Sequence, residues 1–323
     1  MAMKQTVLVL GLGGGVGGET ARQLHAAGWQ VRAMQREIAP AQANDGIVRV
    51  RGDAMNPAEV LAAAEGCAVI VHAVNPPGYR RWSERVLPML DSTIAAARQV
   101  HASIVLPGTV YNYGPDAFPF VAEGAAQRPL TRKGGIRVEM ERRLQAFSRQ
   151  DGRVVIVRAG DFFGPQAANN WFAQGLIKPD RAVRTIYNPG RAGVGHQWSY
   201  LPDVARTVVE LLKRADSLDA FATFHMQGHW DASGTQMVEA IRRVVGKLGG
   251  GVPRVAPFPW WLLRFVAPFN ETVREMMEMR YLWQEPVRLD NARLVATLGT
   301  EPFTPLDLAV EQTLRGLHCL PTG

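Results

Sequence analysis

A short apolar run that ends in a glycine-rich turn is the feature that most constrains the fold of this chain. The residues Val7 to Leu10 are all apolar, and the next eight residues include six glycines. Such glycines allow a tight turn, close approach of backbone N–H groups to a phosphate, and close packing of a helix on a strand. The helix that follows would point its positive dipole end at that anion. We therefore expect a nucleotide site, rather than a plain connector, formed by Gly11, Leu12, Gly13, Gly14, Gly15, Val16 and Gly17.

The first half of the chain alternates β-rich runs with helical patterns, which is typical of a parallel sheet with crossover helices. Strands are expected at residues 6–10, 30–34, 47–51, 68–73, 103–107 and 153–158, and helices at 15–27, 57–64, 82–100 and 133–149. From residue 160 to 195, Gly, Pro, Asn and Trp become frequent, as in loops that carry a site. We therefore expect an α/β Rossmann domain, doubly wound, over residues 1–160 with a returning part at about 196–228. Residues 161–195 and 229–323 would form a smaller substrate-binding lobe.

Composition limits the classes of partner. The chain has 323 residues and a net charge of +7, which suits an anionic ligand, but its basic residues are scattered, so we expect no nucleic acid. Two cysteines, Cys67 and Cys319, cannot form a disulfide framework and fit a reducing cytoplasm. The N-terminus lacks a signal-peptide layout, and no apolar run reaches the ~20 residues that span a bilayer. We expect a cytoplasmic protein that acts on a small molecule, with no membrane partner and with a homodimer as one oligomeric option.

Several motifs follow the glycine-rich turn in a fixed order. They are the Gly11/Gly14/Gly17 spacing, Gly52-Asp53, the segment 72–75, the segment 158–164 and the segment 289–294. In this order they resemble the extended short-chain dehydrogenases/reductases, in the branch of NAD(P)-dependent epimerases and dehydratases, over nearly the whole chain. The resemblance implies that Asp53 caps the adenine amino group. It also implies that Ala73, Val74 and Asn75 lie beside the cofactor.

The end of the second expected strand bears on the choice between NADP and NAD. NAD-binding relatives carry an acid there for the ribose hydroxyls, whereas this chain has Arg36 before the first acid, Glu37. A guanidinium can clamp the 2′-phosphate of NADP through charge-assisted hydrogen bonds, and Arg36 matches an arginine that atypical, NmrA-like relatives use in this way. We expect NADP. NAD remains an alternative because Glu37 could hold the ribose hydroxyls. Arg36 could also be a solvated surface arginine with no role in cofactor binding.

The catalytic positions depart from the family pattern. Enzymes of the family use a Ser/Thr, a Tyr and a Lys, and Thr109 matches the first of these. The Tyr-x-x-x-Lys pair is replaced by Lys133 and Arg137, which lie one helical turn apart on one face. Isoflavone-reductase-like and NmrA-like relatives resemble this pattern, and their lysine serves as an acid or anchors the ribose. Desolvation beside Arg137 would lower the pKa of Lys133 and let it donate a proton.

Each of these positions has a plainer interpretation. Thr109 could satisfy local backbone, Lys133 and Arg137 could be solvated, and Tyr111 could replace Lys133 as the proton donor. His225 and His229 lie four residues apart outside a helix without carboxylates in register, so we expect no metal site.

Three functions remain open at this level. The first is an NADP(H)-dependent oxidoreductase that acts on a small organic carbonyl or an activated double bond, with Thr109, Lys133 and Arg137 in the site. The second is a non-catalytic NADP-binding redox sensor of the NmrA-like kind. The third is a nucleotide-sugar epimerase or dehydratase, which the missing tyrosine disfavours.

The segment from residue 253 to 283 is rich in tryptophan and phenylalanine at irregular spacing. It could be a lid over a hydrophobic substrate, a dimer face or, most commonly, core of the smaller lobe. A membrane surface is less expected because basic residues do not dominate the segment.

Overall fold

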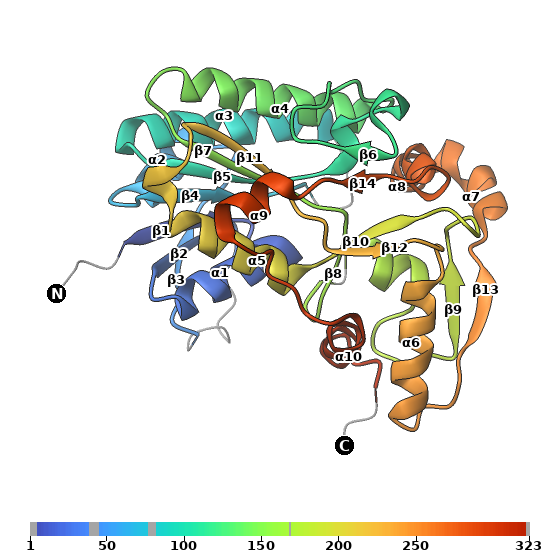
Figure 1. Cartoon of the computed structure of the whole chain (residues 1–323). Coiled ribbons are helices and arrows are strands. Elements are labelled where there is room, and N and C mark those ends of the chain that lie inside the picture. Colours follow the sequence, from blue (N-terminus) through green and yellow to red (C-terminus); the bar gives the residue numbers. More distant parts are fainter. Residues whose placement is uncertain (1–4, 39–44, 77–81, 168, 321–323) are drawn as a thin grey trace.

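The computed structural model describes residues 5–38, 45–76, 82–167 and 169–320 of the chain. Its centre is a seven-stranded parallel sheet with the strand order β11-β7-β5-β4-β1-β2-β3 (Figure 1). The strands in that order are Phe221–His225, Val154–Arg158, Ser103–Gly108, Val69–His72, Thr6–Leu10, Gln30–Gln35 and Val48–Arg51. The expected α/β Rossmann class is therefore confirmed, and the ends of β1 to β5 and of β7 lie within one residue of their expected positions.

Helices cover both faces of this sheet because successive residues of a strand point to opposite sides. Leu8 and Leu10 of β1 belong to the core under α2 (Pro57–Ala64), α3 (Trp82–Val100) and α4 (Arg132–Ser148). Val7 and Val9 belong to the other core, under α1 (Gly15–Ala26), α5 (Leu201–Leu212) and α9 (Ala292–Leu298). The two cores explain why the central strands are apolar on both sides.

The chain reverses direction across the sheet between β1 and β4. From β1 it proceeds outward to β2 and β3, and from β4 it proceeds the other way to β5, β7 and β11. The carboxyl ends of β1 and β4 therefore diverge into loops on opposite faces, which opens a crevice at this point. Open α/β sheets bind their ligands there.

The smaller lobe is built from short pairings. A three-stranded sheet has the order β12-β10-β8, and two-stranded sheets pair β13 with β9 and β14 with β6. The bounds of these strands are His229–Asp231, His196–Tyr200, Asp161–Phe163, Arg254–Pro257, Thr185–Asn188, Arg288–Leu289 and Phe120–Val121. The lobe's helices are α6 (Gln236–Lys247), α7 (Trp260–Val266), α8 (Glu271–Glu278) and α10 (Leu306–Gly316). Figure 1 shows them beside the carboxyl edge of the main sheet.

Short single-turn helices complete the lobes: η3 (Val110–Asn112), η4 (Pro115–Ala117), η5 (Phe172–Leu176), η6 (Ala215–Ser217), η7 (Ala267–Phe269) and η8 (Met279–Trp283). Residues 160–195, expected as loops, therefore contain β8, η5 and β9. Local periodicity could not reveal β8 and β9, because each has three or four residues and pairs with a strand far away in the sequence.

A buried ion pair fastens α4 to the sheet. Arg158, at the carboxyl end of β7, is 1% exposed and donates from Nε to Glu141 of α4 at 3.0 Å. A second guanidinium nitrogen bonds the other oxygen of the same carboxylate. Arg158 also lies 2.9 Å from Nε2 of His225, whose Nδ1 lies 3.1 Å from the Val121 carbonyl oxygen. Burial lowers the pKa of His225 to about 3, so its neutral ring accepts from Arg158 and donates to Val121.

We predict that Glu141→Ala lowers the free energy of unfolding by about 3–5 kcal/mol, since it leaves the Arg158 charge buried without its partner. Urea denaturation followed by circular dichroism measures this. Glu139→Ala, which removes a partly exposed pairing with Arg142 and Arg143 on the same helix, is the matched control, with an expected cost below about 1 kcal/mol. Equal losses in the two variants would contradict this account of α4.

Candidate active site and cofactor crevice

The glycine-rich turn fits tightly against the end of β4. Gly11 has a φ of +99°, and a Cβ atom on it would lie 2.5 Å from the Ala73 carbonyl oxygen. A Cβ on Gly17 would lie 2.2 Å from the carbonyl oxygen of Gly11. By contrast, a Cβ on Gly13 would meet no atom within 4 Å. Gly11 and Gly17 thus let helix and strands approach, while Gly13 leaves the outer side of the turn open to a ligand.

The first turn of α1 is suited to an anion. Its N-cap, Gly14, has no side chain to accept from the first N–H groups, and no acidic residue lies in the first turn. These donors and the helix dipole face the crevice between β1 and β4, as phosphate binding requires. The residues present therefore fit the pyrophosphate of a dinucleotide, with the N–H groups of residues 15–17 as the donors that would hold it.

The other predicted cofactor residues follow the carboxyl ends of neighbouring strands. Arg36 comes directly after β2 and is exposed, and Asp53 comes after β3 and is half-buried. Asp53 accepts from the Met55 N–H at 3.0 Å, which shapes its turn. After β4, Ala73 donates its N–H to Leu10, and the Asn75 side chain accepts from the Trp82 indole. All these positions therefore lie along one edge of the sheet.

Lys133 is buried at the start of α4. Its side chain is 4% exposed, and its Nζ lies 3.1 Å from a carboxylate oxygen of Glu275 in α8. Burial lowers the pKa of Lys133, while the negative charges of Glu275 and Glu278 oppose that shift. The pKa of Lys133 is therefore lowered in the expected direction, and desolvation by burial is the main cause. The pKa of His72 is lowered to about 3, mainly by burial and secondly by the positive charge of Arg137.

Two local features fix the start of α4. The Thr131 hydroxyl caps the helix by accepting from the Gly134 N–H at 3.1 Å. A Cβ on Gly134 would lie 2.3 Å from the Tyr111 carbonyl oxygen, so only glycine lets this turn approach η3 so closely. The result is that Tyr111 and Lys133 line one cavity.

The three predicted catalytic residues have different surroundings. Thr109 follows β5, and its hydroxyl oxygen accepts from the Tyr111 N–H at 3.3 Å, which caps η3. Arg137 donates to the Pro107 carbonyl at 3.3 Å, and its guanidinium carbon lies 5.5 Å from the centre of the Trp82 ring. Among the described residues, the cavity is lined by Lys133 but not by Thr109 or Arg137.

The cavity lies between the two lobes and has a volume of about 190 Å³. One wall of the cavity comes from η3 and α4. The other wall comes from β8, from residues 169–174 around the start of η5, and from α8 and η8. Its lining residues are Tyr111, Lys133, Asp161, Phe162, Asn169, Asn170, Trp171, Gln174, Glu275, Met276 and Met279. Of these, the sequence predicts Tyr111 and Lys133 as candidate proton donors, and one motif contains Asp161 and Phe162, whereas Glu275 has no local signal.

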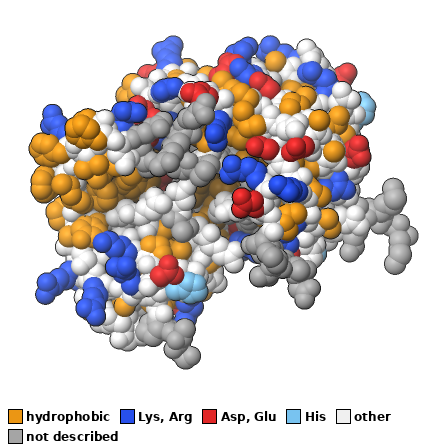
Figure 2. Space-filling view, turned by 180° about the vertical axis from the view of Figure 1, so that it is seen from behind, with side chains coloured by type: hydrophobic (Ala, Val, Ile, Leu, Met, Phe, Trp, Pro, Cys, Tyr) orange, Lys and Arg blue, Asp and Glu red, His pale blue; other side chains and the backbone are white. Residues whose placement is uncertain are grey.

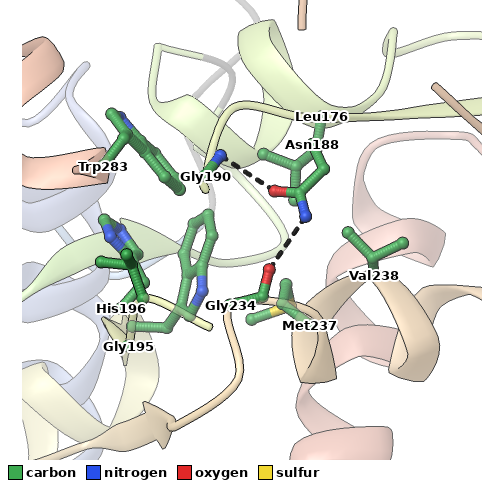
Figure 3. Close-up of a pocket in the computed structure, with 11 residues that line it drawn as sticks. Leu176, Asn188, Gly190, Gly195, His196, Gly234, Met237, Val238 and Trp283 are labelled. Atoms are coloured by element: carbon green, nitrogen blue, oxygen red, sulfur yellow. Dashed lines mark hydrogen bonds between the residues drawn. The ribbon is translucent and has the colours of Figure 1, made fainter. Parts of the chain in front are cut away.

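Asp161 is held by a histidine behind it. His196 Nε2 lies 2.9 Å from an Asp161 carboxylate oxygen, and Nδ1 lies 3.2 Å from the Leu282 carbonyl oxygen. The His196 ring stacks on Trp283 with centroids 3.7 Å apart (Figure 3). Both ring nitrogens of His196 therefore face oxygen atoms, which fixes the orientation of the ring behind Asp161.

A much smaller cavity, about 10 Å³, lies on the far side of His196 (Figure 3). The Asn188 side chain crosses it, donating to Gly234 at 2.9 Å and accepting from the Gly190 N–H at 3.0 Å. This cavity has room for about one water molecule and no larger ligand.

Across the described ranges, no group of three or more His, Cys, Asp or Glu side chains could hold a metal ion. His229 instead packs on Phe163 and Phe303, with ring centroids 5.7 and 4.7 Å away. In the part of the chain that the structure describes, no helix has both the length and the apolar character to cross a bilayer.

Comparison with known proteins agrees with this geometry. A sequence model described as the NAD dependent epimerase/dehydratase family matches residues 7–226. The solved UDP-glucose 4-epimerase from Brucella ovis in complex with NAD has a TM-score of 0.74 and 19% identity, and the match covers 97% of this chain and 98% of that chain. MoeE5 in complex with UDP-glucuronic acid and NAD has a TM-score of 0.70, 18% identity and coverage of 96% and 98%. No curated protein matches the chain. At these identities the structural matches show the fold.

We predict that Gly13→Ala weakens binding of NADPH and NADH at least tenfold while leaving the melting temperature unchanged. An added methyl group has space within the protein but would stand between the turn and a phosphate. Gly124→Ala, also with open space around it and far from the turn in sequence, is the matched control. Calorimetric titration and thermal unfolding measure the two effects. Unaltered dinucleotide affinity in Gly13→Ala would refute the assignment of the phosphate site.

Proposed function

The chain belongs to the NAD dependent epimerase/dehydratase family of extended short-chain dehydrogenases/reductases, and from that premise we propose that it is an NADP(H)-dependent reductase of a small organic carbonyl or activated double bond. The observation that carries the proposal is the burial of Lys133 beside the cavity. Its buried amine lies on the wall of a cavity at the carboxyl edge of the sheet, and by the sequence resemblance it takes the place of the family's catalytic tyrosine.

The chemistry divides between cofactor and protein. Bound NADPH supplies the hydride. Lys133 donates the proton from Nζ to the developing alkoxide or carbanion, and its positive charge stabilises that negative charge before transfer. Glu275 holds the amine in place and keeps it protonated, and Trp171, Met276 and Met279 exclude water around it.

The size and charge of the cavity support a small substrate. Its volume of about 190 Å³ is below the 300–1,000 Å³ of sites for drug-sized ligands. Around it, among the described residues, the Lys133 charge is paired with Glu275, and Asp161 adds a carboxylate. A nucleoside diphosphate would instead need unpaired cationic groups near its phosphates.

A nucleotide-sugar epimerase or dehydratase is the second candidate. The family match and the similar folds of UDP-sugar enzymes favour it. An NADP-binding redox sensor is the third, and the replacement of the family's tyrosine supports it. The choice of NADP over NAD rests on Arg36, whereas the similar solved structures are described with NAD.

We predict that Lys133→Met lowers kcat at least 100-fold while NADPH affinity stays within threefold of the native value. The assay is NADPH consumption against a panel of aldehydes, ketones, enones and quinones, with UDP-glucose epimerisation followed by NMR in parallel. Turnover that survives in Lys133→Met would remove the proposed acid. Epimerisation without carbonyl reduction would establish the second candidate, and tight NADPH binding with neither activity would favour the sensor.

The pH dependence of reduction tests the same residue. Lys133 donates only when protonated, so the rate should fall as pH rises through its pKa, which burial holds below the ordinary 10.5. Glu275→Gln removes a charge that raises this pKa, so the alkaline limb of kcat should move to lower pH. Arg142→Gln, on the exposed side of α4, is the control. A limb that does not move in Glu275→Gln would contradict proton donation by Lys133.

We predict that Arg36→Ala weakens NADPH binding about tenfold and leaves NADH binding unchanged, because a guanidinium contact to the 2′-phosphate is available only to NADPH. Arg51→Ala, an exposed arginine at the end of β3, serves as the control. If NADPH binds the native protein no more tightly than NADH, the NADP preference is wrong.

A further inference from the structure

Helix α7 turns its apolar side to solvent. Five large apolar residues of α7 and η7 are exposed and form what we call the aromatic face: Trp261, Leu262, Phe265, Val266 and Phe269, with exposed fractions of 69%, 46%, 70%, 39% and 91%. Their spacing places them on one side of a helix. No residue of α7 is buried. The usual pattern of a surface helix, with the apolar side inward, is therefore reversed.

The inner side of α7 is fixed to the smaller lobe. The Trp260 indole donates to the Pro189 carbonyl at 2.9 Å. Its ring packs on Phe258 and Trp171, with centroids 4.8 and 5.6 Å away. These contacts of Trp260 fix the orientation of α7, so the aromatic face has a defined position on the surface. Soluble proteins rarely expose large apolar patches except where they bind a partner or a membrane.

The charged residues of α7 and of the strand that leads to it are basic: β13 carries Arg254, α7 carries Arg264, and neither element contains an acidic residue. The adjacent helix α8 carries charges of both signs. Strand β13, which leads to α7, exposes Val255 and carries the exposed Arg254. The paired strand β9 follows the exposed Arg184. Figure 2 shows hydrophobic side chains gathered on this edge of the molecule, with basic side chains at the margins.

A second copy of the chain suits this face poorly. In a two-fold symmetric contact the same patch faces itself, so Arg254 and Arg264 of both copies would gather in one contact, and neither β13 nor α7 supplies an acid to pair with them. A lipid surface with anionic headgroups supplies the missing negative charge. Tryptophan and phenylalanine are also suited to the boundary between headgroups and acyl chains.

We propose that the aromatic face docks the protein on an anionic phospholipid surface. Trp261, Phe265 and Phe269 would enter the boundary of the headgroups, and Arg264 and Arg254 would contact the phosphates. The sequence alone favoured no membrane partner, because basic residues do not dominate the segment. The exposed face and the arginine next to β9 are what the folded structure adds. This docking is independent of the reaction at Lys133.

The test is flotation of the whole protein with phosphatidylcholine vesicles, with and without phosphatidylglycerol. We expect binding to the anionic vesicles alone, weakened at least tenfold in the variant Trp261→Ser, Phe265→Ser, Phe269→Ser. Arg264→Glu should weaken it about fivefold or more, and raised salt should weaken it in the native protein. Val48→Ser with Leu308→Ser, which removes two exposed apolar side chains on other elements, is the matched control.

Light scattering after size-exclusion chromatography measures the oligomeric state and so distinguishes a second copy of the chain from a lipid surface as the occupant of the face. A native dimer that the triple serine variant converts to a monomer, with no vesicle binding, would overturn the proposal in favour of a second copy. Vesicle binding that the triple variant retains, or the absence of binding to any vesicle, would also overturn it. Because the three side chains are exposed, the variant should unfold at the native temperature, and thermal unfolding checks this.

Discussion

The buried pairing of Arg158 with Glu141 fixes the position of α4 and, with it, one wall of the candidate site. Arg158 ends a central strand, and Glu141 lies two turns into α4, so the pair fixes that helix along the sheet. The Glu141 carboxylate also accepts from Asn112 at 2.8 Å and from Gln127 at 2.7 Å. The loop after β5 is thereby tied to the same group. Lys133 at the start of α4 and Tyr111 in η3 consequently keep one position relative to the cofactor crevice.

The cavity itself depends on a second ion pair, which joins the lobes. Lys133 belongs to the dinucleotide-binding half, and Glu275 belongs to α8 in the C-terminal part of the chain. A buried amine without this carboxylate would carry an uncompensated charge, so closure of the two lobes and retention of a proton on Lys133 favour each other. The aromatic cluster around Trp171 extends the same wall to Trp260, the first residue of α7.

The sequence predicts well what depends on short-range patterns. The glycine-rich turn, the strands of the main sheet and four helices follow from local spacing, and their positions agree closely with the structure. Contacts between distant segments could not be predicted in this way. Glu275 approaches Lys133 across the lobe boundary, and Asp161 meets His196 through pairing of short strands. The aromatic residues of α7 show a further limit, since periodicity identifies an apolar side but does not say whether another element covers it.

The proposed role of Lys133, in place of the tyrosine of the family pattern, also bears on the direction of the proposed reaction. Oxidising a hydroxyl requires a base, and Lys133 becomes one only after losing its proton, which Glu275 opposes. Reduction requires an acid, and a protonated amine fulfils that role while its charge attracts the developing alkoxide. An epimerase needs both roles in each turnover, because it removes and returns the same proton. The proposed acid therefore favours reduction at neutral pH, because the Lys133–Glu275 ion pair that joins the lobes opposes loss of its proton.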